Sequence, residues 1–327
     1  MTWLVWRQHR VQYCVGAALL AVFAVLIVIT GAQVAHQYAA AQAACAAGQG
    51  CRHLGGLFLG SHVVGFLVIS TLGAPALVGL FWGAPLVAAE AEAGTAQFAW
   101  MQSVTRRHWL TVKIGWMLLA AAVWGGVISA LVTWWSGPDN AEQLDAFNPG
   151  RFDIMGLMPV AYSLFAVALG IAAGAVTRRV LPAMAVTLAG FIAVRAVVAL
   201  WLRPHYMSAV TVFYKATSSF TPTGSYWQLA SGIIGPDGQP VNSNFSNEAV
   251  IDGIPASYLP ASCNPPARGP FTPPPSCTQA LGHFREFLTY QPADRYWAFQ
   301  GIEAGIFLVL AAGLVAVTAA VLLRRDV

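Results

Sequence analysis

Six apolar segments, each long enough to cross a membrane, constrain this chain more than any other feature. They lie at about 11–32, 57–82, 112–135, 154–176, 180–202 and 299–323. A spanning helix needs roughly 20 apolar residues, and a helix satisfies its own backbone polar groups in lipid. Charged residues make up only 9% of the 327 residues, against about 25% in a soluble domain. The sequence therefore predicts an all-α polytopic membrane protein with six transmembrane helices.

The first twelve residues carry two tryptophans and two arginines, Arg7 and Arg10, ahead of the first apolar segment. Indole and cationic side chains suit a helix that lies in the membrane interface, so we expect an N-terminal interfacial helix here. An ordinary basic flank is the alternative. A cleaved signal peptide is the competing interpretation, but this apolar segment is long for one and five more follow.

The distribution of basic residues predicts the orientation. With the N-terminus inside, the cytoplasmic segments hold nine Lys or Arg residues and three acids, and the outer segments hold seven and nine. Cytoplasmic loops are enriched in Lys and Arg. We therefore expect a multi-pass protein of the plasma membrane with both termini in the cytoplasm. The net charge of +4 reflects this bias and does not indicate nucleic-acid binding.

Four of the five cysteines fall in the predicted outer loops. Cys45 and Cys51 lie in the first of these loops, and Cys263 and Cys277 in the last. Disulfides form on the oxidising side of a membrane, so we predict the pairs Cys45–Cys51 and Cys263–Cys277. Free thiols are the alternative, and no histidine spacing supports a metal site.

The chain divides into three parts. Residues 1–202 carry the interfacial helix and five spans, 203–298 form a long hydrophilic loop, and 299–327 hold the sixth span and the tail. The loop is rich in proline and glycine in its middle, which favours turns. Its ends, 210–216 and 280–290, are expected to form short helices. We interpret it as a small extracellular cap pinned by its disulfide, with a disordered linker as the alternative.

Two ionisable residues, Arg195 and Glu303, fall inside the fifth and sixth apolar segments. Charged groups at membrane depth are costly without partners, so we expect them to pair or to share a polar network. The network is either part of an exit gate for a substrate or a structural pair that fixes the register of two helices.

Glycines recur at four-residue spacing, which lets helices approach closely in lipid. The pairs are Gly56/Gly60, Gly79/Gly83, Gly170/Gly174 and Gly301/Gly305. We interpret them as general packing positions.

The chain lacks the motifs of a catalytic or nucleotide-binding protein. It has no phosphate loop, no HExxH and no CxxC. Ser61 and His62 lie near the end of the second segment, where a polar pair is more often structural. We expect no catalytic site, no metal and no cofactor in this chain.

A charged segment, 88–113, separates the second and third apolar segments. It contains, in order, Glu90, Glu92, Gly94, Thr95, then Ser103-Val104-Thr105-Arg106-Arg107, then Lys113. This order resembles the segment after the second span in permease subunits of ABC-2 type transporters. The opening Trp3–Arg10 and the alanine-rich composition of the chain resemble actinobacterial members in particular. The family usually has a proline where Ser103-Val104 stand. Six spans and a longest outer loop before the sixth fit the same family, whose fold is that of type V exporters.

The resemblance implies that 88–113 contains a coupling helix that contacts a separate ABC ATPase. Glu90 and Glu92 would contact basic groups of the ATPase, and Arg106 and Arg107 would contact its acids or lipid phosphates. The alternative is that these are solvated charges, and for Arg106 and Arg107 it weighs equally. ATP and Mg would be bound by the ATPase, and two permeases, expected as a homodimer, would assemble with two ATPases.

We expect export of a hydrophobic or amphipathic compound along a path between spans two and five, with Phe66, Phe191 and Trp201 as candidate lining residues. The alternatives are a non-transporting sensor or assembly subunit and an intramembrane enzyme.

Overall fold

The structure is a computed structural model of the chain. It describes residues 2–47, 62–94, 105–136, 147, 149–215, 218, 220–223, 226–241, 250–251, 254–255, 258–260, 263 and 274–324. The chain forms two compact units. The first consists of Met1–Tyr206 together with Trp297–Val327, and the second is Met207–Tyr296. The second unit lies within the long hydrophilic loop of the sequence.

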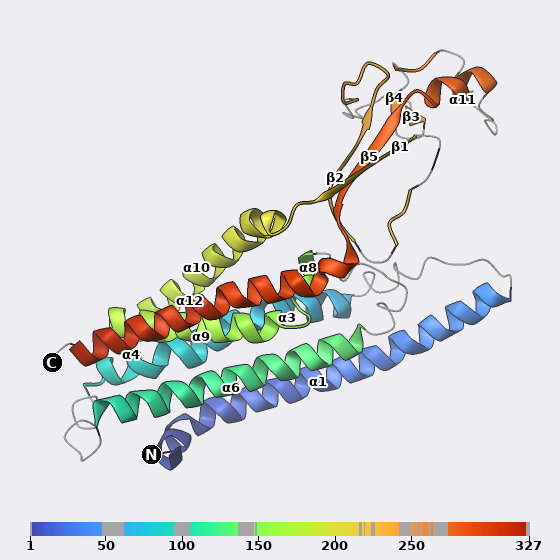
Figure 1. The fold of residues 1–327 in the computed structure, drawn as a ribbon. Helices are drawn as coiled ribbons and strands as arrows, with labels where there is room; N and C mark the ends of the chain where they lie inside the picture. The colour runs from blue at the N-terminus through green and yellow to red at the C-terminus, as the bar shows by residue number, and fades with distance from the viewer. Residues whose placement is uncertain are drawn as a thin grey trace. The chain divides into compact units, whose positions relative to one another are not determined.

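The first unit is a bundle of long helices (Figure 1). Its elements are α1 (Thr2–Ala46), α3 (His62–Val78), η1 (Gly79–Gly83), α4 (Ala84–Glu92), α6 (Arg106–Trp135), α8 (Pro149–Phe152), α9 (Met158–Thr177), α10 (Val180–Val197), η2 (Val198–Leu202), η3 (Arg203–His205) and α12 (Tyr296–Arg324).

The prediction of six spans is confirmed. Six stretches of the described residues are long and apolar enough to cross a membrane: Arg10–Gln37, Gly65–Glu92, Arg107–Trp135, Met158–Thr177, Val180–His205 and Ala293–Leu323. The second ends ten residues later than predicted, because the apolar helix continues through the two glutamates at its end.

The N-terminal residues do not form a separate interfacial helix. Residues 2–12 are the first turns of α1, a continuous helix of 45 residues. At 1.5 Å per residue such a helix is about 68 Å long, more than twice the roughly 30 Å of the hydrocarbon core. The helix therefore extends beyond the hydrocarbon core, and the candidate first span within it is Arg10–Gln37.

The second span changes its hydrogen-bonding pattern in the middle. The π-helical turn η1 joins α3 to α4, and Pro85 follows it closely. A proline has no N–H to offer to the carbonyl four residues earlier, which is that of Phe81. The Gln12 side chain of α1 donates to this carbonyl at 3.2 Å. A partner from a neighbouring helix thus accompanies the irregular turn.

Glycines let the second span pack directly on α9, the most buried of the spanning helices. A Cβ built on Gly79 would lie 2.7 Å from the carbonyl oxygen of Ala166, and one on Gly83 would lie 2.6 Å from that of Val167. From the other side, a Cβ on Gly170 would lie 2.5 Å from the oxygen of Gly79. Any larger side chain at these positions would force the two helices apart.

The second unit contains β-structure. Its three-stranded antiparallel sheet has the order β1-β5-β2, formed by β1 (Val210–Lys215), β5 (Arg285–Gln291) and β2 (Trp227–Ile234). The expectation of short helices at 210–216 and 280–290 is wrong for most of these residues. Both segments alternate β-branched or aromatic residues, which is typical of strands, and they pair with each other.

A small hydrophobic core supports the sheet. The described residues of this unit also form a two-stranded ladder, β3 (Val250–Ile251) and β4 (Ile254–Pro255), the helix α11 (Pro275–Leu281) and the short 3-10 helix η6 (Ala293–Arg295). Cys263 is bonded to Cys277 and both are fully buried, beside Leu281 and Phe284. The proposed pair Cys45–Cys51 lies outside the described residues.

Candidate functional site

An ionic cluster lies within the first unit, among the ends of several helices. Its centre is Arg203, only 1% exposed. The Arg203 guanidinium donates to Glu303 from Nε at 2.7 Å and from Nη2 at 2.6 Å, and Nη2 also contacts Asp153. Arg203 is the first residue of η3, near the end of the fifth span, and Glu303 lies two turns into α12. One arginine thus holds an acid from α12 and an acid that precedes α9.

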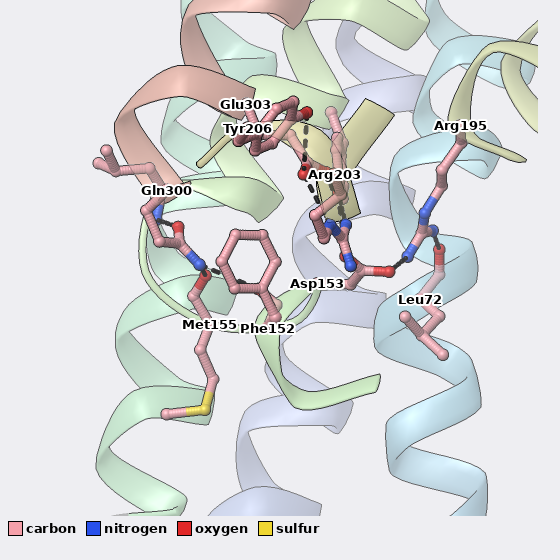
Figure 2. Close-up of polar contacts among 11 residues, drawn as sticks. Leu72, Phe152, Asp153, Met155, Arg195, Arg203, Tyr206, Gln300 and Glu303 are labelled. Atoms are coloured by element: carbon pink, nitrogen blue, oxygen red, sulfur yellow. Dashed lines mark hydrogen bonds and ion pairs between the residues drawn. The ribbon is translucent and has the colours of Figure 1, made fainter. Parts of the chain in front are cut away.

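Arg195 extends the cluster toward the second span. Its Nη2 lies 2.7 Å from Asp153, and its Nη1 donates to the carbonyl oxygen of Leu72 at 3.0 Å (Figure 2). The Arg195 guanidinium also lies over the ring of Tyr162, 4.8 Å from its centroid. Asp153 therefore bridges two arginines.

Two tyrosines complete the cluster. The Tyr162 hydroxyl lies 2.6 Å from Glu303 and 3.1 Å from Asp153, and the Tyr206 hydroxyl donates to Glu303 at 3.4 Å. Burial and the neighbouring Glu303 carboxylate raise the pKa of Tyr206. Tyr206 therefore stays neutral and able to donate throughout the physiological pH range.

Gln300 fixes the connection between the third and fourth spans against α12. Its Nε2 donates to the carbonyl of Phe152 at 3.1 Å, and its Oε1 accepts from the N–H of Leu157 at 2.9 Å (Figure 2). Gln300 is fully buried. The residues on either side of Asp153 are thus held in place from α12, one turn before Glu303.

The charge of this cluster is balanced, since two cations face two carboxylates. We refer to Asp153, Tyr162, Arg195, Arg203 and Glu303 as the charge network. In a low-dielectric interior an unpaired charge costs several kcal/mol, so the network holds only while all four charges stay together. It joins the second span, the segment before the fourth, the fifth span and the sixth. This arrangement can act as a latch between helices.

The sequence identified two of these residues. The structure does not bring Arg195 and Glu303 into direct contact, but links them through Asp153 and Arg203. Sequence reasoning assigned Asp153 and Arg203 to the outer loops, because each stands at the end of an apolar segment. The expected fourth span began at Ile154, whereas α9 begins at Met158. One feature of the sequence could have indicated the network: two acids and two arginines, equal in number and opposite in charge, lie at similar depth in or beside the apolar segments.

A second ionic contact lies in the candidate coupling segment. Lys113 in α6 is 2% exposed, and its Nζ lies 2.5 Å from the Glu90 carboxylate of α4. The ammonium also lies 4.8 Å from the ring centroid of Trp109. Glu90 and Leu72 belong to the same span, 18 residues apart, which corresponds to about 27 Å of helix. The Glu90–Lys113 pair therefore lies near the opposite end of the bundle from the charge network.

The second glutamate of the segment contacts a different helix. Glu92 accepts a hydrogen bond from the N–H of Val180, the first residue of α10, at 3.0 Å. A carboxylate at a helix N-terminus satisfies a backbone donor and interacts favourably with the helix dipole. Gly94 follows with φ of 64°, a conformation that favours glycine. The chain thus turns away from the second span immediately after its two anchored acids.

The rest of the coupling segment is only partly described. Arg107 is exposed in the first turn of α6, and Thr105 caps this helix by accepting from the N–H of His108. Thr95 and the side chain of Arg106 lie outside the described residues.

The three residues proposed to line a substrate path have different surroundings. Phe191 is buried and lines an apolar groove of about 490 Å³ between α3 and α10, with Arg195 at the same groove. Phe66 and Trp201 are 62% and 70% exposed on the helix surfaces and do not line this groove. The groove is open and almost free of polar groups apart from Arg195.

Comparison with known families gives one match. Residues 17–203 match the family described as ABC-2 membrane transporter related, which is more than half of the chain. The matched region includes most of the first span and of the fifth, the three spans between them, the candidate coupling segment and four residues of the charge network. No curated protein and no solved structure matches the chain.

Proposed function

The chain belongs to the ABC-2 membrane transporter related family and is a multi-pass transmembrane permease subunit; from this premise we propose that it exports a hydrophobic or amphipathic compound, driven by a separate ATPase. Membership of an ABC-2 permease family implies an ABC ATPase partner in general. The single observation that carries the proposal is the anchoring of Glu90 and Glu92 to two different spanning helices.

The orientation follows from charge. Lys and Arg exceed acids by nine to three in the segments on the side of the termini, and cytoplasmic loops carry this excess. Both termini and residues 88–113 are therefore proposed to be cytoplasmic, where an ATPase is available. The unit Met207–Tyr296 then lies outside, where its Cys263–Cys277 disulfide is stable.

The coupling segment is proposed to transmit force through its glutamates. Glu90 is engaged by Lys113 of the third span, and Glu92 by the N-terminus of α10. Both carboxylates are thus occupied within the chain. Contact with the ATPase is then proposed to fall to the segment 94–106, which includes Gly94, Thr95 and Arg106, together with exposed Arg107. A displacement of this segment would act on spans two, three and five through the Glu90 and Glu92 contacts.

The charge network is proposed to latch the outer ends of the spans. Arg195 ties Asp153 to the second span, and Arg203 ties it to the sixth. Opening a path between spans two and five requires the Arg195–Leu72 hydrogen bond to break. Breaking this bond costs little free energy compared with separating the ion pairs. The network then stays neutral while the second span moves.

Two copies of the permease are proposed to assemble with two ATPases. Exposed apolar side chains cover α10 and η2, with Leu181 of α10 and Leu200 of η2 both 79% exposed, so this span has a surface for lipid or for a second copy. The apolar groove beside Phe191 favours an apolar cargo body.

Affinity purification of the full-length chain tests the proposed partner. We expect an ATPase with a phosphate loop to co-purify, and to be lost when Gly94–Thr105 is replaced by a flexible linker of the same length. Arg107→Glu should weaken the association, whereas the matched charge reversal Arg268→Glu, in the outer region, should not. Retention of the ATPase by the linker variant would refute the coupling assignment.

A further inference from the structure

We propose that one face of the β1-β5-β2 sheet binds an amphipathic anion, a compound with an aromatic or apolar body and one carboxylate, sulfonate or phosphate group. The face consists of three cross-strand rows, and we call it the cationic–aromatic face. The rows are Lys215, Arg285 and Ile234; Phe213, Phe287 and Gly232; and Thr211, Thr289 and Ala230.

Its first row places two cations side by side. Lys215 and Arg285 are direct partners in the antiparallel register, so their side chains leave the same face with Cβ atoms about 5 Å apart. Both are exposed. Like charges directly opposite each other destabilise a sheet, and none of the nine residues of the face is acidic. An anion between the two side chains would relieve this repulsion and accept hydrogen bonds from both.

The nearest acid on β5 does not relieve the repulsion. Glu286 points to the opposite face of the sheet, since side chains alternate along a strand. It is engaged there by the hydroxyl of Tyr214, and burial together with this hydrogen bond raises the pKa of Tyr214 to about 12. The cationic row therefore keeps its charge within the described part of the sheet.

The second row is an aromatic platform next to the cations. The rings of Phe213 and Phe287 have centroids 6.3 Å apart, and Phe213 is 58% exposed. A Cβ on Gly232 would lie 2.8 Å from the Phe287 ring, so this ring extends over the third strand, where the glycine leaves room for it. The exposed ring of Phe213 and the half-buried ring of Phe287 together offer an apolar stacking surface beside the two cations.

The spacing of the rows defines the ligand. Successive residues on one face are two positions apart, or about 7 Å along the strand. A ligand with its anionic group between Lys215 and Arg285 would therefore place a fused ring system, joined directly to that group, over Phe213 and Phe287. The hydroxyls of Thr211 and Thr289 bond to each other at 2.9 Å and bound the platform on the far side. The binding requires neither the ATPase nor transport.

Direct binding to the full-length chain tests the inference. The protein is placed in phosphatidylcholine nanodiscs, tritiated naphthalene-2-sulfonate is titrated in a scintillation proximity assay, and binding to empty nanodiscs is subtracted. We expect saturable binding that weakens about tenfold in Lys215→Gln with Arg285→Gln, since two exposed ionic contacts are removed. Lys215→Arg should retain binding. Phe213→Ala should weaken the binding of the sulfonate and the binding of its neutral analogue, 2-naphthalenemethanol, by the same factor.

Matched controls separate a site from general attraction. Arg178→Gln with Arg179→Gln removes two exposed cations from the other unit and should leave binding unchanged. Binding no greater than to empty nanodiscs, equal loss in the control, or full binding by Lys215→Gln with Arg285→Gln would each overturn the proposal. Because the assay contains no ATPase, a failure of transport does not affect its result.

Discussion

Removing one charge from the network should cost far more than removing a matched pair. The two arginines and two acids sum to zero. Glu303→Gln keeps the shape of the side chain but leaves a net charge of +1, and Arg203→Met leaves −1. The double variant is neutral again and retains the Asp153–Arg195 pair. The three variants therefore separate the cost of an unpaired charge from the cost of lost packing.

The magnitude follows from burial. Arg203 and Glu303 are 1% and 0% exposed, and removing one partner of a buried pair costs about 3–5 kcal/mol. Replacing both partners by apolar groups is often close to neutral. We therefore expect each single variant to unfold about 10 °C below the wild type. The double variant should recover most of that loss, which is a coupling energy of at least about 3 kcal/mol.

Thermal unfolding of the purified protein in one detergent provides the assay. The midpoint is followed by the loss of the monodisperse peak in size-exclusion chromatography after heating. If the double variant is as unstable as the sum of the two singles, the residues do not act as a pair. If Glu303→Gln alone is neutral, the carboxylate is not ionised and the network as described is wrong.

Three further predictions follow from the fold. Lys113→Met should lower the free energy of unfolding by about 2 kcal/mol, because it removes the buried cation that pairs with Glu90. Adding Glu90→Leu to Lys113→Met should recover part of that stability; no recovery would exclude an ion-pair role. Gly83→Val should lower the free energy of unfolding by at least about 3 kcal/mol, because the larger side chain overpacks against α9; the measurement is the amount of folded protein in membranes. Gly301→Val should be tolerated, because the space around Gly301 is open. Cys263→Ser should lower the stability of the outer unit by about 3 kcal/mol and expose Cys277 to alkylation in unreduced cells; alkylation of Cys277 in the wild type would contradict the disulfide.

The sequence was sufficient for the spans because hydrocarbon thickness imposes a length that apolar composition reveals directly. It was not sufficient for the sheet of the unit Met207–Tyr296. β1 and β5 pair across about seventy residues of intervening chain, and each strand alone is too short to distinguish from a helical turn. Only the partner strand reveals the alternation as a sheet face.

For a related reason, only part of the charge network could be predicted from the sequence. Arg195 and Glu303 stand out because charges inside apolar segments are rare. Asp153 and Arg203 look like ordinary flanks, and only the fold turns their side chains inward.

The glycine pairs show the same limit. Gly79 meets α9 at contact distance, whereas Gly301 and Gly305 have no neighbour within 4 Å of a built Cβ. Gly56 and Gly60 lie outside the described residues. Four-residue spacing indicates that a close approach is possible on one face of a helix, but not which face meets a neighbour.

The central claim is that a separate ATPase drives this permease through residues 88–113. The most direct test is ATP hydrolysis by the purified permease–ATPase complex in liposomes, measured with and without a panel of amphipathic compounds. We predict that at least one compound stimulates hydrolysis, and that the linker replacement of Gly94–Thr105 abolishes this stimulation. Equal stimulation of the ATPase alone or of the linker variant would contradict the account.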